Sequence, residues 1–368
     1  MNRNLPNIAF LLGSTCSHGG IERVTSLLAS TFAEKAIAEI HAVAFQPRDR
    51  EQVYEWSEKV TFFELMKERK SMKSGIFKAV PKLRKYLKNN SIDILIVCGH
   101  LCCPLGGFSV LGTNTKMIYW SHSSYYGEVN HFKRINEHIG AICSKVVISL
   151  TKADKLNYRK KTLAKKVTQI YNPIDENLFL KSSPYNPNTN KIISVGRLDH
   201  PKNFESYLLE VAQMVLSKNP EYTWHIYGKG SLHDLIKENI DKLGLTGKVI
   251  LEGNVTDLYE QYSKYSLMVM TSSYEGFPMS LLEGMVNKLP LVSFDIQTGP
   301  NEIIQNDKSG FLIVPYDRPN MAKKIQELID CQDLRINFSR ASEILINQYK
   351  MDTVLKKWTK LLNNLIDN

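Results

Sequence analysis

The sequence predicts an α/β protein built from two doubly wound, Rossmann-like domains that face a central cleft. Short apolar runs of strand length alternate with longer amphipathic stretches along all 368 residues, and this rhythm favours parallel sheets covered by helices. The length suffices for two domains of ordinary size. Residues 172–190, rich in Pro, Asn, Ser and Asp, separate two series of apolar runs and have the composition of an interdomain linker.

The first series predicts an N-terminal, Rossmann-like domain over residues 1–171. The apolar run from Ile8 to Leu12 is too short for a secretory segment and leads straight into a glycine turn, so it is interpreted as the first strand. The strands expected in this domain are Asn7–Leu12, Ile40–Phe45, Ile92–Cys98, Lys116–Trp120, Lys145–Ser149 and Val167–Ile170.

The second series predicts a C-terminal domain over residues 191–350, followed by a C-terminal crossover helix in residues 351–368. Apolar residues recur at helical spacing from Asn203 to Leu216, and again as one stripe from Met351 to Leu365. The strands expected here are Lys191–Val195, Tyr222–Ile226, Lys248–Leu251, Ser266–Met270, Leu289–Ser293 and Gly310–Val314.

Composition narrows the class of protein. No uninterrupted apolar stretch reaches the roughly 18 residues of a membrane span. Six cysteines include no C-x-x-C pair, and the cluster of Cys98, His100, Cys102 and Cys103 has adjacent thiols, which rarely bind one tetrahedral ion. Buried free thiols and no metal are expected, which favours a reducing compartment, most simply the cytoplasm.

The net charge of +10 lies almost entirely in the first half of the chain. It is concentrated in Lys67 to Lys88, where apolar and basic residues alternate as in an amphipathic helix, and in Lys152 to Lys166. Three interpretations remain open: a solvated lysine face, docking on an anionic membrane surface or a lipid-diphosphate substrate, and nucleic-acid binding. The last is disfavoured, because no recognition motif accompanies the charge.

The most informative segment runs from Tyr274 to Glu283. It places two carboxylates, Glu275 and Glu283, eight positions apart across a predicted strand-to-helix turn, with Pro278 suited to the first helical turn. A carboxylate accepts two hydrogen bonds and can hold the vicinal hydroxyls of a sugar or ribose. The ordinary alternative is a pair of solvated glutamates on either side of a turn.

Each series also has one turn of interest directly after its first strand. Gly19 and Gly20 precede a helix start, where free N–H groups favour an anion, although such turns are common. Arg197 and Lys202 also stand before a helix and can neutralise a diphosphate, unless they are simply exposed basic residues. His122 follows a strand end, a position open to both a structural and a catalytic role.

Taken together and in this order, the motifs resemble those of the retaining glycosyltransferases of family 4, which have the GT-B fold. The resemblance covers essentially the whole chain. It rests on Gly19-Gly20-Ile21-Glu22-Arg23, His122, Gly196-Arg197-Leu198 with Lys202, Ile226-Tyr227-Gly228-Lys229-Gly230, the Glu275-to-Glu283 element with its Gly-Phe-Pro core, and Gly299-Pro300-Asn301-Glu302-Ile303.

The resemblance implies that residues 1–171 form the acceptor-side domain and residues 191–350 the nucleotide-sugar-binding domain, with a donor site made by both. Arg197 and Lys202 would bind the diphosphate and steady the leaving nucleotide, and Glu283 would hold the ribose hydroxyls. Glu275 would contact the transferred sugar. The remaining implied donor residues are Gly19 and Gly20 at the diphosphate, Gly276, Phe277 and Pro278 at the sugar through their backbone, His122 near the sugar from the other domain, and Gly228, Asn254 and Val255 near the base. The C-terminal helix would cross back to the N-terminal domain.

The implied activity is retaining, metal-independent transfer of a hexose or N-acetylhexosamine from a nucleotide sugar, most simply a UDP-sugar. The acceptor would be a glycan or lipid-linked glycan for a bacterial surface polysaccharide, capsule, lipopolysaccharide or lipooligosaccharide. The chain has no Asp-x-Asp element, and cations with helix N-termini can stabilise the leaving group without a metal cofactor. The enzyme would be cytoplasmic and peripheral on the inner face of the membrane.

Two alternatives stay open. One is a GT-B relative with different chemistry, either a nucleotide-sugar epimerase or an inverting transferase. The other is a non-catalytic sugar-nucleotide-binding partner subunit. The sequence leaves the sugar, the base, the acceptor and the linkage undetermined.

Overall fold

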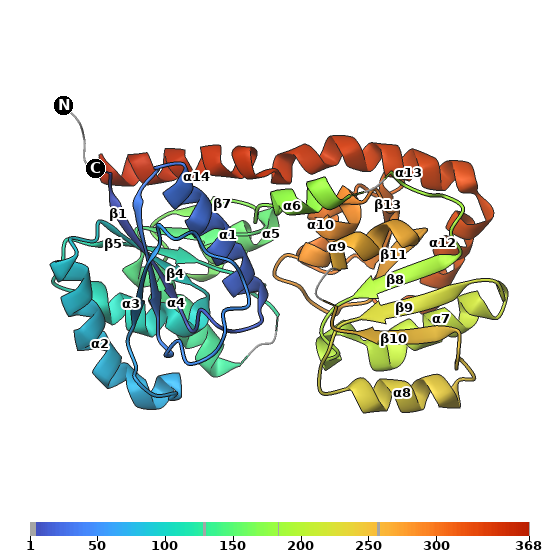
Figure 1. Cartoon of the computed structure of the whole chain (residues 1–368), viewed down its shortest axis with the longest axis horizontal. Coiled ribbons are helices and arrows are strands. Elements are labelled where there is room, and N and C mark those ends of the chain that lie inside the picture. The colour runs from blue at the N-terminus through green and yellow to red at the C-terminus, as the bar shows by residue number, and fades with distance from the viewer. Residues whose placement is uncertain (1–4, 128–129, 183, 256–257, 368) are drawn as a thin grey trace. The chain divides into compact units, whose positions relative to one another are not determined.

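The computed structural model describes residues 5–127, 130–182, 184–255 and 258–367. The chain divides into two compact α/β units (Figure 1). The first unit comprises residues 1–173 and 352–368, and the second comprises residues 174–351. Each unit has one parallel sheet with helices around it, which confirms the predicted class of two doubly wound domains.

The sheet of the first unit has the order β3-β2-β1-β4-β5-β6-β7, and all its pairings are parallel. The chain order reverses around β1, which lies between β2 and β4. The strands are β1 (Asn7–Leu12), β2 (Glu39–Ala44), β3 (Thr61–Glu64), β4 (Ile94–Cys98), β5 (Lys116–Trp120), β6 (Val146–Ser149) and β7 (Val167–Gln169). The sequence missed β3, a half-exposed edge strand of four residues whose side chains provide little periodicity.

Five α-helices cover this sheet: α1 (Gly20–Glu34), α2 (Met72–Asn89), α3 (Cys103–Val110), α4 (His131–Cys143) and α5 (Lys152–Lys161). A 3-10 turn, η1 (His100–Cys102), precedes α3. Glycines allow α3 and α4 to approach closely, because a Cβ on Gly140 would lie 2.5 Å from the Cys103 sulfur. All six cysteines are free thiols, and within the described ranges no group of His, Cys, Asp and Glu could hold a metal ion.

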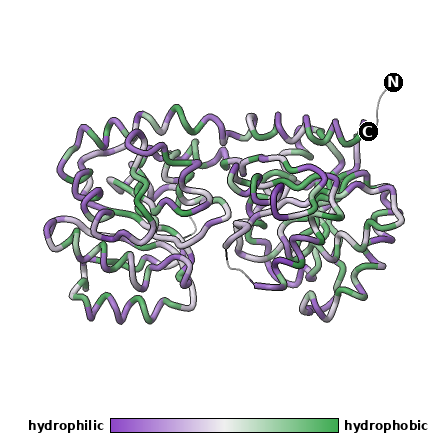
Figure 2. The backbone as a smooth tube through the Cα atoms, turned by 180° about the vertical axis from the view of Figure 1, so that it is seen from behind, coloured by the Kyte–Doolittle hydropathy of each residue, from purple (hydrophilic) through white to green (hydrophobic). Residues whose placement is uncertain are grey.

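The C-terminal helix α14 (Met351–Ile366) packs on the first unit, as the sequence predicted. The ring of Trp358 is fully buried, with its centroid 6.0 Å from that of Phe32 on α1 and 5.1 Å from that of Trp120 on β5. At the start of the helix, Asp352 forms an ion pair of 3.0 Å with Lys35. Figure 2 shows why helices like this one suit a surface position: they alternate between hydrophilic and hydrophobic residues, whereas the strands inside are hydrophobic.

The sheet of the second unit has the order β10-β9-β8-β11-β12-β13, again fully parallel. Here the chain order reverses around β8, which lies between β9 and β11. The strands are β8 (Lys191–Val195), β9 (Thr223–Tyr227), β10 (Val249–Gly253), β11 (Leu267–Met270), β12 (Leu291–Phe294) and β13 (Gly310–Ile313). The predicted strands of both series agree with the observed ones to within two residues at each end.

The helices of the second unit are mostly short. They are α6 (Glu176–Lys181), η2 (His200–Lys202), η3 (Phe204–Leu208), α7 (Leu209–Leu216), α8 (His233–Lys242), α9 (Leu258–Gln261), η4 (Tyr262–Lys264), α10 (Met279–Val286), α11 (Pro300–Ile303), α12 (Arg318–Asp330), α13 (Gln332–Leu345) and η5 (Ile346–Tyr349). Among the described residues no helix is both long and apolar enough to cross a membrane.

The expected continuous helix from Asn203 to Leu216 begins differently. Asn203 adopts a left-handed conformation with φ of 54°, and its side-chain amide donates hydrogen bonds of 2.8 Å to the Thr271 carbonyl and the Ser273 hydroxyl. The following turn, η3, is a π-helix, and regular α-helix starts only at Leu209. The side-chain bonds of Asn203 tie the helix start to the loop after β11.

The predicted linker, residues 172–190, is not a free segment. Its first part contains α6, and its later part packs on the second unit. The Tyr185 hydroxyl donates to the Ser266 carbonyl at 2.7 Å, and Arg335 donates to the Pro187 carbonyl at 2.9 Å. Composition alone suggested a linker because Pro and Asn mark irregular backbone, and irregular backbone can still be packed.

Candidate functional site

The candidate site of the second unit lies at the carboxyl ends of β8 and β11. The loop after β8 carries Arg197 and Lys202, and the loop after β11 carries Glu275. These two strands are neighbours, and β8 is where the chain order reverses. In doubly wound sheets the crevice at such a switch point is the usual ligand site.

Lys202 and Glu275 form an ion pair at this point. The Lys202 ammonium contacts Glu275 Oε1, and both side chains are mostly buried, with exposed fractions of 16% and 14%. The Ser272 hydroxyl donates to the same carboxylate oxygen at 2.7 Å, and Thr271 donates to the Lys202 carbonyl at 2.8 Å. The structure therefore brings together a cation and a carboxylate that the sequence assigned to different parts of a ligand.

Glycines make this arrangement possible. A Cβ on Gly196 would lie 3.0 Å from Cε of Lys202, so the lysine side chain crosses over Gly196. Gly228 follows β9 with φ of 140°, and a Cβ there would overlap the Gly196 carbonyl oxygen. The Gly228 amide donates to the Gly253 carbonyl at 2.7 Å. The ends of β8, β9 and β10 thus approach one another through backbone alone.

Arg197 is placed differently from Lys202. Its side chain is 76% exposed, and its guanidinium forms an ion pair of 2.9 Å with Asp199. Asp199 also accepts a 3.4 Å hydrogen bond from the Ser231 amide. The sequence reading did not select Asp199, although its spacing of two from Arg197 is a usable signal.

The turn between Glu275 and α10 is held by the loop after β12. The Thr298 hydroxyl donates to the Glu275 carbonyl at 2.6 Å, and a Cβ on Gly299 would lie 2.6 Å from Cδ of Pro278. Pro278 is the N-cap of α10. Phe277 is buried with its ring centroid 5.8 Å from that of Tyr349, so the turn between these residues offers backbone rather than an aromatic face.

Glu283 lies on α10 and is buried. Its Oε2 accepts a 2.6 Å hydrogen bond from the hydroxyl of Tyr262, which is also fully buried. Tyr262 begins the short turn η4, and no sequence pattern marked it as a partner of Glu283. Asn254 and Val255 directly follow β10 at the same edge of the sheet, and Asn254 is exposed.

In the first unit, Gly19 is the N-cap of α1 and Gly20 is its first residue. A Cβ on Gly19 would overlap the carboxylate of Glu22, which therefore lies over this glycine. Burial raises the pKa of Glu22. The turn at Gly19, where an anion was expected, is thus next to the carboxyl group of Glu22, to which the sequence analysis gave no role of its own.

His122 follows β5 in the first unit. Its ring centroid is 4.2 Å from that of Trp120. Its Nε2 is buried and has no hydrogen-bond partner among the described residues. Burial lowers the pKa of His122 to about 3, so the imidazole is neutral at pH 7.

Comparison with known proteins gives two family matches. Residues 18–178 match the model "Glycosyltransferase Family 4", and residues 175–344 match "Glycosyl transferases group 1". The chain is 30% identical over 306 residues to the poly(ribitol-phosphate) alpha-N-acetylglucosaminyltransferase of Staphylococcus aureus (strain COL). That match covers 80% of this chain, and the chain spans only 60% of the length of that relative.

A second relative matches end to end. It is the GalNAc-alpha-(1->4)-GalNAc-alpha-(1->3)-diNAcBac-PP-undecaprenol alpha-1,4-N-acetyl-D-galactosaminyltransferase of Campylobacter jejuni, at 24% identity over 363 residues, covering 96% of this chain and 98% of that one. Among solved structures, a mutant of TarM from S. aureus in complex with fondaparinux, alpha-GlcNAc-glycerol and UDP is similar with a TM-score of 0.82. Its identity is 19% and coverage is 99% and 100% of the two chains, so this likeness shows the GT-B fold.

Proposed function

Because this chain belongs to the glycosyltransferases that combine a family 4 domain with a group 1 domain, we propose that it is a retaining, metal-independent glycosyltransferase. It moves a hexose or N-acetylhexosamine from a UDP-sugar to a glycan or lipid-linked glycan acceptor. The product belongs to a bacterial surface polysaccharide or lipooligosaccharide. The observation that carries this proposal is the Lys202–Glu275 pair at the switch point of the second unit.

In this proposal, donor binding separates the pair. The diphosphate replaces Glu275 as the partner of Lys202, and Arg197 leaves Asp199 to bind the same phosphates. The Glu275 carboxylate then accepts hydrogen bonds from hydroxyls of the transferred sugar. Lys202, Glu275 and Arg197 each exchange one partner for another, and Asp199 keeps its hydrogen bonds from Ser231.

The other donor residues surround this exchange. Gly276, Phe277 and Pro278 offer backbone groups to the sugar. Glu283, with its carboxylate oriented by Tyr262, holds the ribose. Additional contacts come from Gly228, Asn254 and Val255 at the base, and from Gly19, Gly20 and His122 of the first unit.

Leaving-group stabilisation accounts for the chemistry without a metal cofactor. Negative charge develops on the diphosphate as the glycosidic bond breaks, and Arg197 and Lys202 stabilise it electrostatically. Attack by the acceptor on the same face, assisted by the leaving phosphate, retains configuration. The alpha linkages in the names of both relatives support retention, since UDP-hexoses are commonly α-linked donors.

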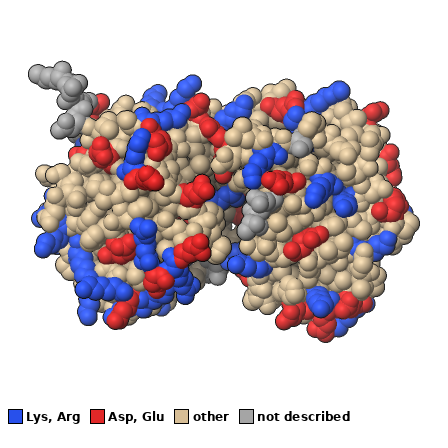
Figure 3. Space-filling view, in the orientation of Figure 1, with Lys and Arg blue, Asp and Glu red and all other residues tan. Residues whose placement is uncertain are grey.

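The acceptor side lies in the first unit, and its basic surface supports a membrane-proximal acceptor. Lys and Arg gather over α2 in Figure 3. Lys73, Lys78, Lys85 and Lys88 on this helix are exposed, and Phe77 is 86% exposed among them. We place the enzyme in the cytoplasm, where free thiols persist, bound peripherally to the inner face of the membrane through α2 and the basic end of α5. The undecaprenol diphosphate in the C. jejuni relative's name supports a lipid-linked acceptor.

A donor screen tests the proposal. The purified chain is heated with each of several nucleotide sugars, and the bound donor is expected to raise the melting temperature because it binds only the native state. The selected donor is then incubated with candidate acceptors, and NMR reads the anomeric configuration of the product. A β-linked product indicates an inverting enzyme, conversion of the free donor sugar without acceptor indicates an epimerase, and binding without turnover indicates a non-catalytic subunit.

A further inference from the structure

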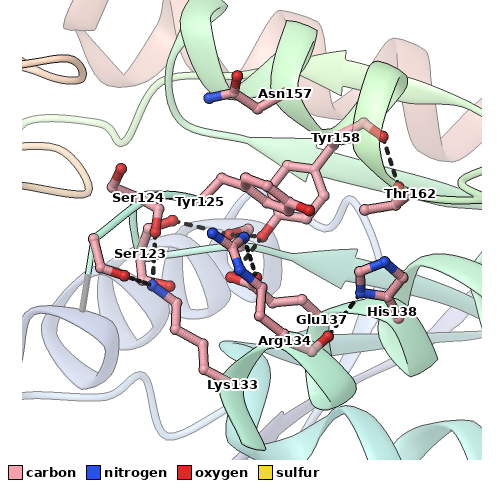
Figure 4. A network of polar contacts seen from close by, with 12 residues as sticks. Ser123, Ser124, Tyr125, Lys133, Arg134, Glu137, His138, Asn157, Tyr158 and Thr162 are labelled. Carbon is pink, nitrogen blue, oxygen red and sulfur yellow. Dashed lines mark hydrogen bonds and ion pairs between the residues drawn. The ribbon is translucent and has the colours of Figure 1, made fainter. Parts of the chain in front are cut away.

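The loop of residues 121–127, which contains His122, is fastened by side chains from two helices. The loop follows β5, and the fastening groups come from α4 and α5 (Figure 4). We call the four side chains Lys133, Glu137, Asp154 and Tyr158 the loop clamp. All four are buried, and none was selected from the sequence.

Lys133 holds the far part of the loop. Its ammonium donates to the Ser124 carbonyl at 2.7 Å and to the Gly127 carbonyl at 2.6 Å. An ammonium group is costly to bury without opposite charge nearby. Glu137 and Asp154 are the nearby acidic groups: burial raises the pKa of both carboxyls, and Lys133 partly offsets that rise. A buried ammonium therefore fixes two backbone carbonyls of the loop.

Tyr158 holds the near end. Its hydroxyl lies 2.9 Å from the Ser121 hydroxyl and 3.2 Å from Glu137 Oε1. The Ser121 hydroxyl in turn donates to the Ser123 carbonyl at 3.2 Å. The bond from Ser121 to Ser123 spans His122. Because each hydroxyl has one proton, the Tyr158 hydroxyl donates either to Ser121, in a chain of bonds that ends at the Ser123 carbonyl, or to Glu137.

Asp154 fastens the middle of the loop. Its Oδ1 accepts a 3.0 Å hydrogen bond from the Tyr125 amide. Its own amide is capped by the Thr151 hydroxyl at 3.1 Å, which fixes the start of α5. The guanidinium of Arg134 lies 3.9 Å above the Tyr125 ring and pairs with Glu137 Oε2 at 3.4 Å. The Tyr125 ring, which belongs to the middle of the loop, is thereby packed next to the clamp.

This fastening matters because the His122 ring has little else to hold it. Its Nε2 makes no hydrogen bond within the described part of the chain, and its ring packs against Trp120 with the two centroids 4.2 Å apart. The position of the imidazole is therefore set by the backbone on either side of it. A shift of about 1 Å in a group that faces substrate can cost roughly a hundredfold in rate.

We propose that the loop clamp positions His122 for the transfer step, so that Lys133, Glu137, Asp154 and Tyr158 are positioning residues of the enzyme. This inference rests on the proposed function. The clamp acts more on the rate of the chemical step than on donor affinity, because His122 supplies one contact to the sugar and the donor-binding cations Arg197 and Lys202 belong to the second unit.

The test compares Tyr158→Phe with Tyr185→Phe. Both changes delete a tyrosine hydroxyl that makes polar contacts. The Tyr158 hydroxyl contacts Tyr119, Ser121 and Glu137 in the first unit, whereas the Tyr185 hydroxyl donates to the Ser266 carbonyl of the second unit. The assay follows UDP release from UDP-N-acetylglucosamine in the presence of acceptor. In Tyr158→Phe, kcat is expected to fall by about tenfold to a hundredfold, while KM for the donor changes by less than about twofold. The control is expected to keep wild-type values for both.

A second measurement does not depend on turnover. Histidine side chains are isotopically labelled, and the His122 ring signal is identified by its absence from His122→Gln. The signal is expected to move in Tyr158→Phe and in Lys133→Met, and to stay in place in Tyr185→Phe.

The outcomes separate the clamp from the proposed function. If kcat of Tyr158→Phe is unchanged or falls only as far as in the control, the positioning role is overturned. If the wild-type chain releases no UDP, the proposed activity fails on this donor, and the His122 signal alone decides: displacement in the clamp variants supports the clamp, and an unmoved signal overturns it.

Discussion

The ammonium of Lys202 contacts the carboxylate of Glu275 across the carboxyl ends of two neighbouring strands. The two residues are 73 positions apart in the sequence, and each is mostly buried. In this ion pair, the cation and the anion each have an opposite charge as their partner. Under the proposed function, both become available together when a ligand carrying phosphates and hydroxyls enters.

Removing Glu275 should affect transfer and UDP binding in opposite directions, whereas removing Lys202 should weaken UDP binding. Glu275→Ala is expected to reduce kcat by at least about a hundredfold, because a contact to the reacting sugar is lost, while UDP binding is kept or strengthened, because Lys202 is released. Lys202→Met is expected to weaken UDP binding. Calorimetric titration with UDP and steady-state rates measure both effects. Unchanged turnover of Glu275→Ala would remove this carboxylate from the site.

Gly228 should tolerate no side chain. Its Cβ would overlap the Gly196 carbonyl, and its φ of 140° is already unfavourable for other residues. Gly228→Ala is expected to destabilise the second unit by about 2–4 kcal/mol. Gly247→Ala is the matched control, since Gly247 has φ of 75° but nothing within 4 Å of its Cβ, and about 1–2 kcal/mol of backbone strain is expected there. Equal effects of the two variants in urea unfolding would show that the close approach of Gly196 and Gly228 is unimportant.

Glu137 should make stability depend on pH. Burial raises the pKa of Glu137 to about 7 in the folded chain, whereas a glutamate in the unfolded chain has its ordinary pKa of 4.5. A raised carboxyl pKa contributes stability that is full below the unfolded pKa and is lost as pH rises toward 7. The free energy of unfolding of the wild type is therefore expected to fall by about 1–3 kcal/mol over this interval relative to Glu137→Gln. Parallel curves for the two proteins between pH 4.5 and 7 would contradict the assignment.

The basic face of α2 should carry membrane binding. Replacement of Lys73, Lys78 and Lys85 by Ser is expected to release the protein from anionic liposomes in low-salt flotation, at about 1 kcal/mol per lysine. The control removes the same charge from exposed lysines of the second unit, Lys218, Lys237 and Lys323. Flotation that is equally weak in both triple variants would reduce the effect to net charge, and no flotation of the wild type would exclude the membrane docking.

The strands and the order of the motifs were predictable from the sequence because they depend on local patterns. Apolar runs such as Asn7–Leu12 and Lys191–Val195 have the same bounds in the structure. The four-residue β3 was missed because it is short and half exposed. The π-helical turn at Phe204 was missed because it follows Asn203, whose bonding partners Thr271 and Ser273 lie about 70 residues away and leave no local pattern.

In the candidate site, too, local features were predictable and tertiary contacts were not. Sequence reasoning selected Lys202, Glu275 and Glu283 separately, from their places beside turns and a helix. Their observed partners, Glu275 for Lys202 and Tyr262 for Glu283, are tertiary contacts without a local signal. The loop clamp could not be predicted for the same reason. In the sequence, Lys133 and Tyr158 have the pattern of ordinary helix residues, and only the fold brings them into contact with the loop that contains His122.

The burial of Trp358 has a consequence for how the chain is made. This residue closes the core of the first unit between Phe32 and Trp120, yet the ribosome adds it after every residue of the second unit. The rest of the first unit therefore leaves the ribosome with an uncovered apolar surface, which stays exposed until synthesis has passed residue 358. A fragment that stops at residue 173 should carry the same exposed surface, and a peptide of residues 351–367 supplied separately should be able to cover it.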